Sequence, residues 1–539
     1  MGQSVALILL AHGCGRCHVD DLTGTDTAPL DAFPMASLTD SSLHYIFSSS
    51  KSTYPSNCPS KNVITPLRNP SSTPPCPTKS KKSTLVVGGG FSGTRLLNLL
   101  KNKVKLHSVV GIEKGDSLGG TWYWNQYPGA QTDTESWVYR FADEREPAEI
   151  VESARKNGTY EDFIFGTEVK SARYDGERKR WEIETDKGHR FSATYFVTAV
   201  GILNNPNIPT YPGIDTFKGQ AFHSARWPKG LDVTGKRVAV IGTGPSGSQI
   251  TGAINKIVKQ LTVFQQRAQY ITPVNNRPVD EVERAEIYKN YDTIWDTVFQ
   301  SLFAMGFVES KKSALEASEE ERREVYERVW NKGGGFRFFF ETFGDLGTSI
   351  EANETAAANP VAKLTETGIE LRDGKQLEFD VIIFATGFDS VDGSYRNVDI
   401  TGREGVKLND VWKNGATSLY GVSVTQFPNL FLVSGPGGPF SNIPPSIEVQ
   451  GDFITKLILE SQARGTKTVE ADKEAQGKWD ETVQAISAVT IFSKVKSWVQ
   501  NDNVEGKTKY SAFFLAGLGN YIAKLEEETG GKYPSFRFE

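Results

Sequence analysis

The fold of this chain is decided by two glycine-rich stretches, Gly88-Gly89-Gly90-Phe91-Ser92-Gly93 and Gly242-Thr243-Gly244-Pro245-Ser246-Gly247. Each directly follows a short apolar run, Leu85-Val86-Val87 in the first case and Val238-Ala239-Val240-Ile241 in the second. This order of strand, tight turn and helix lets the backbone approach a pyrophosphate, whose charge is favoured at the helix N-terminus. The sequence therefore predicts an α/β fold with two Rossmann-like, three-layer dinucleotide-binding domains.

The residue twenty positions after the last glycine of each stretch differs in charge. Counting from Gly93 leads to Glu113, and counting from Gly247 leads to Arg267. A carboxylate accepts hydrogen bonds from a ribose 2′-hydroxyl, whereas a guanidinium matches a 2′-phosphate. We therefore expect FAD in the first domain and NADPH in the second. The expected FAD ligands are Gly88, Gly90, Gly93 and Glu113. The expected NADPH ligands are Gly242, Thr243, Gly244, Pro245, Ser246, Gly247 and Arg267.

Composition restricts the class of protein. The chain has 539 residues, of which 38% are hydrophobic and 23% charged, as in a globular protein of about three domains. Its net charge of −5 gives no electrostatic reason to expect a nucleic-acid or membrane-surface partner. The early apolar run Val5–Ala11 is shorter than the ~20 residues of a spanning helix and lacks the basic flank of a secretory signal. We therefore expect no membrane span and a cytoplasmic location.

All four cysteines precede the first glycine stretch. A redox-active cysteine pair beside the flavin is thus excluded from the folded body, which argues against a flavin disulfide reductase. Cys14, Cys17 and His18 have the spacing of a haem attachment site, but they lie in a segment rich in Ser, Thr and Pro. We interpret that spacing as chance rather than as a haem or zinc site, and we expect no metal.

The second glycine stretch interrupts what reads as a single nucleotide domain. The run Phe196–Gly201 and the later run Val381–Gly387 are both short apolar strands that end in small residues. We therefore expect the NADP domain to be inserted into the FAD domain. The expected parts are a disordered extension over residues 1–80, an FAD domain over 81–230 and 380–539, and an NADP domain over 235–379 with a charged helical insertion at 279–330.

Between the two glycine stretches lies Phe217–Pro228, with the pattern F-x-G-x-x-x-H-x-x-x-W-P. Together with the two stretches, this pattern resembles the Baeyer–Villiger monooxygenases. The resemblance runs from about Thr84 to the C-terminus. It includes the segments 119–130, 334–338, 385–389, 440–445 and 497–507.

The resemblance implies an FAD-dependent, NADPH-consuming enzyme that inserts one oxygen atom of O₂ beside a ketone carbonyl. The product would be an ester or lactone, made in secondary-metabolite biosynthesis by a monomer or a small homo-oligomer. Arg337 would stabilise the negative charge that develops in this reaction, because a fixed cation acts as a preorganised partner. Asp133 would contact the flavin and orient Arg337. Without the resemblance, Arg337 reads as an ordinary surface arginine in an aromatic cluster.

The resemblance also implies further site residues. The additional flavin ligands would be Thr121, Trp122, Tyr123, Trp124, Asp133 and Tyr139. The additional NADP ligands would be Gln131, Thr132, Asp133, Gln249, Gln266 and Trp498. The motif residues Phe217, Gly219, His223 and Trp227 would lie in the linker and couple NADPH binding to domain movement. For His223 we favour this conformational role over direct proton transfer.

Two departures from the family leave alternatives open. Segments expected after Phe141 and after Ala357 are missing, and the cation at Gln266-Arg267 is displaced by one position. Losing a strand exposes a sheet edge, so a truncated nucleotide-binding paralogue without activity is one alternative. An N- or S-oxygenating flavin monooxygenase is the other, because it shares both glycine stretches but does not need Arg337.

Overall fold

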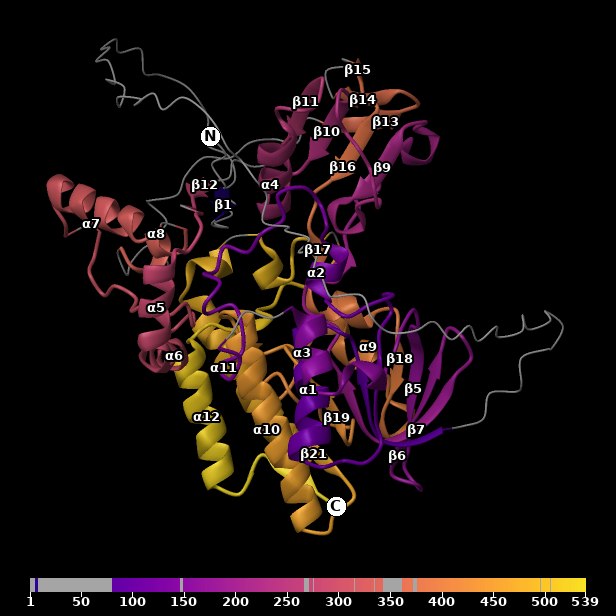
Figure 1. Cartoon of the computed structure of the whole chain (residues 1–539). Helices are drawn as coiled ribbons and strands as arrows, with labels where there is room; N and C mark the ends of the chain where they lie inside the picture. The colour runs from indigo at the N-terminus through magenta and orange to yellow at the C-terminus, as the bar shows by residue number, and fades with distance from the viewer. Residues whose placement is uncertain are drawn as a thin grey trace, which may run out of the picture. The chain divides into compact units, whose positions relative to one another are not determined.

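The computed structural model describes residues 5–7, 80–145, 149–265, 271–274, 276–314, 316–333, 335–342, 361–371, 376–494, 496–504 and 506–539 (Figure 1). The predictions for Cys14, Cys17, His18, Gln266 and Arg267, and for nearly all of residues 1–80, lie outside these ranges. Within that segment, β1 (Val5–Leu7) pairs antiparallel with β12 (Ile271–Pro273). None of the helices in the described ranges is long and apolar enough to cross a membrane.

The first nucleotide unit is built on an eight-stranded sheet. Parallel strands β7 (Arg190–Thr198), β2 (Ser80–Val87), β3 (Val109–Ile112) and β4 (Phe163–Ile164) form one side. On the other side, β7 continues antiparallel into β6 (Arg180–Thr185) and β5 (Val169–Asp175), which β18 (Asp399–Thr401) extends; β19 (Leu430–Leu432) also pairs with β7. Helix α1 (Phe91–Asn98) packs beside α10 (Ile443–Ala463), as Figure 1 shows.

The second nucleotide unit has a four-stranded parallel sheet. Its strand order is β11 (Gln260–Phe264), β10 (Arg237–Ile241), β16 (Val381–Phe384) and β9 (Gln220–His223), and α4 (Pro245–Ile254) follows β10. A small antiparallel sheet of β13 (Val361–Thr365), β14 (Gly368–Leu371) and β15 (Gln376–Glu378) precedes β16. The two Rossmann-type units predicted from the glycine stretches are therefore present.

The strand pairing differs from the expected domain boundaries. Strands β9 and β16 pair with each other, from Val381 beside Gln220 to Phe384 beside His223, and both belong to the second sheet. The boundaries expected from the sequence place both in the FAD domain. The chain passes between the units where β8 (Asn205–Pro206) pairs with β17 (Phe388–Asp389). The small residues after Phe384 therefore lie against the second glycine turn. A short apolar run in the sequence predicts a strand, but it does not show which sheet that strand joins.

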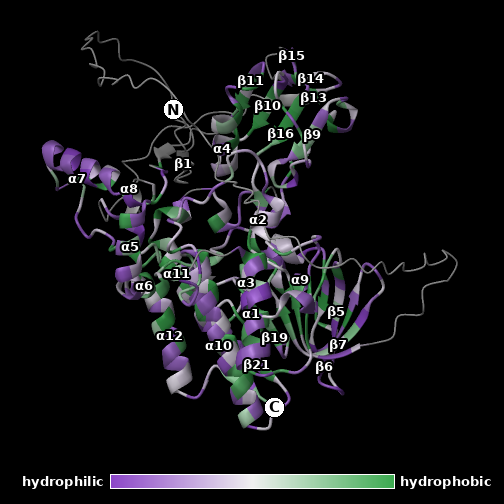
Figure 2. Cartoon of the chain, viewed as in Figure 1, coloured by the Kyte–Doolittle hydropathy of each residue, from purple (hydrophilic) through white to green (hydrophobic). Residues whose placement is uncertain are grey.

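Helices occupy the segment in which a helical insertion was expected. They are α5 (Glu281–Lys289), α6 (Tyr291–Gln300) and α7 (Glu319–Asn331), followed by the short α8 (Arg337–Phe340). Figure 2 shows α7 as largely hydrophilic, and only Val325 and Val329 of this helix are buried. In contrast, α6 buries Trp295 in the core shared with α12 (Leu518–Gly530). This part of the segment therefore packs against the first unit.

The following α-helices and strands complete the set in the described part of the chain. They are α2 (Thr121–Trp124), α3 (Ile150–Lys156), α9 (Leu408–Val411), α11 (Lys473–Ala488), and the paired strands β20 (Gly438–Pro439) with β22 (Phe513–Phe514) and β21 (Val469–Ala471) with β23 (Phe536–Phe538).

Candidate active site

The first glycine turn has no room for side chains. Gly88 has φ of +107°, and a Cβ placed on it would lie 2.2 Å from the carbonyl oxygen of Ala199. A Cβ on Gly93 would lie 1.8 Å from the carbonyl oxygen of Gly88. Gly90 is the N-cap of α1 and offers no side chain to its first N–H groups. Those N–H groups therefore remain available to an anion, and the turn fits a pyrophosphate.

The second glycine turn repeats this geometry. Gly242 has φ of +109°, and its Cβ would lie 2.3 Å from the carbonyl oxygen of Ala385. A Cβ on Gly247 would lie 2.1 Å from the carbonyl oxygen of Gly242. Around the N-cap residue Gly244, no atom of the described residues comes within 4 Å of the Cβ position, and α4 has no side-chain cap. The two turns form matching cradles for two dinucleotides.

Glu113 lies where the first cradle needs a ribose partner. It directly follows β3, is buried, and accepts hydrogen bonds of 2.6 Å from the backbone N–H groups of Gly89 and Gly115. Burial raises the pKa of its carboxyl group, and those two hydrogen bonds oppose the rise. A hydroxyl pair of a bound ribose can hydrogen-bond to the same oxygens.

The counterpart of Glu113 in the second unit is Gln265, not Arg267. The Gly88 N–H donates to the carbonyl of Ile112, one residue before Glu113, and the Gly242 N–H donates to the carbonyl of Phe264, one residue before Gln265. Counting twenty residues from Gly247 passes this position, because fewer residues separate the glycine turn from the end of the next strand in the second unit than in the first. Gln265 is exposed. Its neutral amide presents no negative charge that would repel a 2′-phosphate.

A loop of the first unit lies on the N-terminal turn of α4. The Tyr127 hydroxyl is 2.9 Å from Gln249 Oε1 and 3.2 Å from Ser246 Oγ. Gln249 Nε2 also donates to the backbone carbonyl of Gln131 at 3.1 Å. Two expected NADP ligands, Ser246 and Gln249, therefore hold this loop through their side chains. The same loop continues through Thr132, whose hydroxyl accepts from the Thr134 N–H, toward Asp133.

Two of the expected flavin aromatics meet beside the first cradle. Trp122 and Tyr139 pack edge to face with ring centroids 6.0 Å apart. Tyr139 also packs at 5.6 Å against Phe91, the first residue of α1. Burial raises the pKa of Tyr139 to about 12, although a hydrogen bond from Trp122 opposes the rise, so its hydroxyl stays protonated at neutral pH.

The other residues of α2 connect this region to the F-x-G-x-x-x-H-x-x-x-W-P motif. The Tyr123 hydroxyl accepts a hydrogen bond of 3.0 Å from the Asp116 N–H. The Trp124 ring is covered by the Arg226 guanidinium, whose central carbon lies 4.3 Å from the ring centroid. Thr121 begins the helix and is exposed.

His223 is held in one neutral tautomer. Its Nδ1 accepts a hydrogen bond from the Ala225 N–H at 3.1 Å, so Nε2 carries the proton and donates to the Gly387 carbonyl at 2.8 Å. Burial lowers the pKa of His223 to about 4, against the effect of the bond to Gly387. With both ring nitrogens occupied by backbone groups, this geometry favours the conformational role over proton transfer.

The rest of the motif packs along the edge of the second sheet. A Cβ on Gly219 would lie 2.5 Å from the backbone carbonyl oxygen of Asp380, so glycine is required there. Trp227 packs edge to face with Phe222 at 5.2 Å. Further along the chain, Trp498 packs against Phe513 with centroids 5.4 Å apart, and its backbone carbonyl accepts from Ser390 Oγ.

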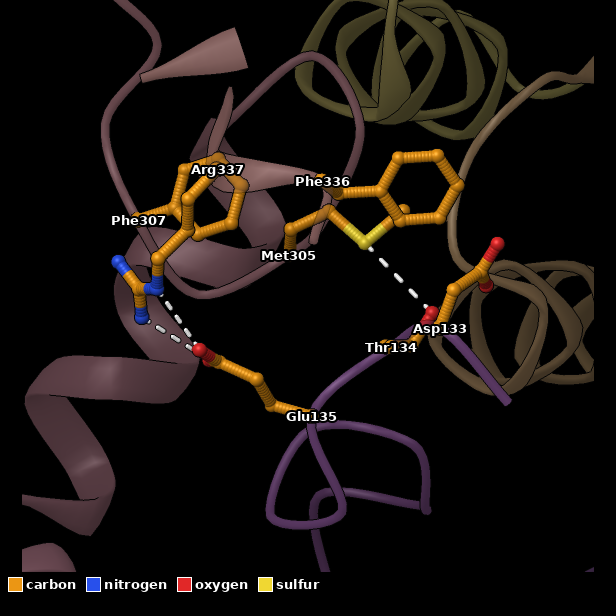
Figure 3. Close-up of a pocket in the computed structure, with 7 residues that line it drawn as sticks. All are labelled: Asp133, Thr134, Glu135, Met305, Phe307, Phe336 and Arg337. Carbon is orange, nitrogen blue, oxygen red and sulfur yellow. Dashed lines mark hydrogen bonds and ion pairs between the residues drawn. The ribbon is translucent and has the colours of Figure 1, made fainter. Parts of the chain in front are cut away.

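Arg337 is paired with two glutamates, of which Figure 3 shows Glu135. Its Nε and Nη2 donate to the two carboxylate oxygens of Glu135 at 2.7 and 3.0 Å. Its Nη1 donates to Glu341 Oε2 at 2.6 Å. The guanidinium also lies over the Phe307 ring at 4.7 Å. The arginine is thus a partly buried, fully oriented cation.

Asp133 does not orient Arg337 in this structure, in contrast to the sequence expectation. Both residues line one small pocket of about 20 Å³, together with Thr134, Met305 and Phe336. Figure 3 shows the Asp133 carboxylate on the other side of this pocket from the guanidinium. Burial raises the pKa of Asp133 to about 6, against a backbone hydrogen bond. Within the described residues, the carboxylate partners of Arg337 are Glu135 and Glu341.

Sequence reasoning missed several residues of this region. Glu341, the C-cap residue of α8, lies four residues after Arg337, a spacing that predicts an ion pair. Glu135 and Tyr127 carried no comparable signal, because their partners lie far away in the chain. Lys507 lies in the segment 497–507 that carries the resemblance, but no role was predicted for it; its Nζ lies 2.6 Å from an oxygen of Asp389 and thereby connects the loop of Trp498 to β17. In the part of the chain that the structure describes, no group of three His, Cys, Asp or Glu residues could hold a metal ion.

Comparisons with known proteins agree on one family. The model of the flavin-binding monooxygenase-like family matches residues 154–395. A Baeyer–Villiger monooxygenase of Pseudooceanicola batsensis is 38% identical over an alignment of 515 positions, and the alignment covers 82% of this chain and 94% of that protein. The phenazine N-monooxygenase PhzNO1 of Lysobacter antibioticus is 36% identical, with 85% of this chain and 97% of that protein covered. The crystal structure of a cyclohexanone monooxygenase from Rhodococcus sp. Phi1 bound to NADP⁺ has a TM-score of 0.81 and 38% identity, over 86% of this chain and 100% of that one.

The same comparison bears on the segments expected to be missing. Since 82% of 539 residues is about 440, about 70 of the 515 aligned positions have no counterpart in this chain. The first of the two expected gaps lies in residues 142–162, where the structure has α3. Most of the second lies outside the described residues.

Proposed function

The chain belongs to the Baeyer–Villiger monooxygenases, and on that premise we propose that it converts a small ketone into an ester or lactone by inserting one oxygen atom of O₂ beside the carbonyl. It is an NADPH-dependent flavin monooxygenase with FAD and NADP(H) as its cofactors. The observation that carries the proposal is the pair of matching cradles, joined through the Tyr127–Gln131 loop to the pocket of Arg337 and Asp133.

The first cradle would hold FAD and the second NADPH. When bound in the first cradle, FAD would supply the redox chemistry, namely reduction by NADPH and activation of O₂. The N–H groups at the start of α1 and α4 would bind the two pyrophosphates, and Glu113 would bind the flavin's ribose. Trp122 and Tyr139 would exclude water beside the first cradle. These residues would bind and orient the cofactors without taking part in proton transfer.

Arg337 and Asp133 are the proposed catalytic residues. Oxygen insertion beside a carbonyl places negative charge on the ketone oxygen, and a preorganised guanidinium stabilises such charge in a site that excludes water. Arg337 has that character, because its side chain is only 13% exposed and is held on three of its nitrogens. The carboxyl group of Asp133, on the other side of the pocket, would determine the negative charge that faces the guanidinium.

Oxygenation of a heteroatom is the second candidate function. It is favoured by the relative whose name is phenazine N-monooxygenase, since that protein resembles this chain almost as closely as the Baeyer–Villiger relative does. In this reaction the oxygen acceptor is a nitrogen lone pair, and no negative charge develops on a ketone oxygen.

One experiment tests both functions. The purified protein is incubated with NADPH, O₂ and a panel of ketones, amines and sulfides, and mass spectrometry identifies which compound gains oxygen. We expect a yellow protein that consumes NADPH in preference to NADH and forms an ester or lactone. A colourless protein that releases no flavin on denaturation would instead support the truncated paralogue.

We expect Gln265→Glu to shift the preference from NADPH toward NADH. A carboxylate at the position equivalent to Glu113 would bind a 2′-hydroxyl and repel a 2′-phosphate, which changes relative affinity by about tenfold or more. The measurement is the ratio of kcat/KM for the two nicotinamides in flavin reduction, with Gln260→Glu, at the exposed first residue of β11, as the control. An unchanged ratio would place the 2′-phosphate away from Gln265.

We expect Asp133→Asn to stabilise the cofactor-free protein at neutral pH. The folded state raises the pKa of Asp133 from 3.8 to about 6, so it binds the proton more tightly than the unfolded chain. The contribution of protonated Asp133 to the free energy of unfolding is therefore complete below about pH 4, and it is lost as the pH rises through about 6. Thermal unfolding should show the variant more stable by about 1–3 kcal/mol at pH 8, with the difference vanishing toward pH 4. Equal stability at both pH values would contradict the raised pKa.

A further inference from the structure

The ion pairs of Arg337 are nearly closed off from water. The side chain of Glu135 is 21% exposed and that of Glu341 is 12% exposed. A guanidinium and carboxylates that are partly desolvated interact more strongly than exposed pairs, and a bidentate pair also fixes the plane of the guanidinium. The orientation of Arg337 is therefore determined by these two carboxylates.

The positive and negative charges of Arg337 and its ion-pair partners balance. Lys332, at the end of α7, also pairs with Glu341, so two cations face two carboxylates. Burial works against the ionised form of Glu341, but the Lys332 and Arg337 cations together hold its pKa below the ordinary value. Glu341 thus has a second cation of its own, whereas the hydrogen bonds of the Glu135 carboxylate go to Arg337.

The two glutamates differ in what they are attached to. Glu341 directly follows α8 and is four residues from Arg337, so it moves together with the arginine. Gly333 and Gly335 precede α8 with φ of +131° and +59°, a backbone in which L side chains are strained. Glu135, in contrast, follows the loop that Gln249 fastens to α4. It connects the arginine to the segment that contacts the second cradle.

We propose that Glu135 is the positioning residue of Arg337, and that it takes the orienting role that the sequence assigned to Asp133. This inference rests on the proposed function of Arg337. Glu135 fixes the position of the Arg337 guanidinium relative to the loop that lies against α4. The cation is therefore correctly placed when NADP occupies the second cradle. Asp133 remains a separate charge in the pocket.

The test compares Glu135→Gln with the wild type. We expect unchanged FAD content and unchanged flavin reduction by NADPH, because neither cradle is altered. Ester formed per NADPH consumed should fall about tenfold, with the difference recovered as H₂O₂, since a misplaced stabilising group reduces the reaction by one to two orders of magnitude. The fall should appear in kcat and not in the KM for the ketone, and Glu135→Asp should restore part of it. Glu366→Gln, which alters the exposed pair of Lys218 and Glu366, is the matched control.

A second measurement does not depend on activity. Melting temperatures are compared for Glu135→Gln, Arg337→Gln and the double variant. We expect the double variant to lose no more than the worse single variant, because each single change removes the bidentate partner of a partly buried charge. Additive losses, or a wild-type ester yield in Glu135→Gln, would overturn the inference. If the wild type forms no ester, the proposed function fails, while the melting temperatures still report whether the pair exists.

Discussion

Arg337→Ala is expected to retain flavin reduction by NADPH and to lose at least about a hundredfold in ester formation. Removing one preorganised group that stabilises developing negative charge costs about that factor in known enzymes. Flavin reduction does not need this cation, because hydride transfer from NADPH generates no negative charge on a ketone. Stopped-flow absorbance measures the reduction, and chromatography measures the ester. NADPH consumption should continue with release of H₂O₂.

The controls separate charge from folding. Arg337→Lys keeps the positive charge but loses the bidentate geometry with Glu135, so we expect an intermediate ester yield. Arg277→Ala removes an arginine that pairs with Glu283 on the surface, and should leave the yield unchanged. A full ester yield from Arg337→Ala would remove this residue from the reaction and would favour heteroatom oxygenation.

Gly247→Ala is expected to slow flavin reduction by NADPH strongly while FAD stays bound. The new Cβ would lie 2.1 Å from the Gly242 carbonyl oxygen, a distance that backbone atoms cannot accept without shifting. The turn must therefore open, which moves the N–H groups of α4 away from the pyrophosphate. We expect the rate at a fixed NADPH concentration to fall at least about a hundredfold, since misplacement by about 1 Å has effects of that size. Dithionite should still reduce the flavin.

Gly252→Ala provides a control on the same helix. No atom of the described residues comes within 4 Å of its Cβ position, and Gly252 is exposed. Alanine there should stabilise α4 by about 0.5–1 kcal/mol and leave NADPH oxidation unchanged. If Gly247→Ala and Gly252→Ala behave alike, the close approach of Gly247 to Gly242 is not what holds NADPH.

Local patterns predicted the elements on which both cofactor sites are built. A strand, a glycine turn and a helix are contiguous in sequence, so Gly88 to Gly93 and Gly242 to Gly247 are recognisable from the order of their residues alone. The Phe217–Pro228 motif is also contiguous, and the comparisons confirm the family that it indicated. In each case the chemistry requires particular residues at short, fixed spacing.

Partners that are distant in sequence could not be assigned in this way. Asp133 and Glu135 lie two residues apart, and both are acids near the expected pocket. Which of them binds Arg337 depends on the path of the loop that Tyr127 anchors to α4, and sequence spacing carries no information about that path. The prediction for Asp133 as the orienting residue was wrong for this reason.

The sequence alone thus predicted two dinucleotide cradles, because turn geometry and helix N-termini depend on adjacent residues, and its contiguous motifs indicated the family by resemblance. Tertiary structure alone decided that β16 joins the second sheet, that Gln265 is the counterpart of Glu113, and that Glu135 holds Arg337. These outcomes depend on which strands pair and on which side chains are buried together. Both are properties of the whole packed chain and not of any one segment.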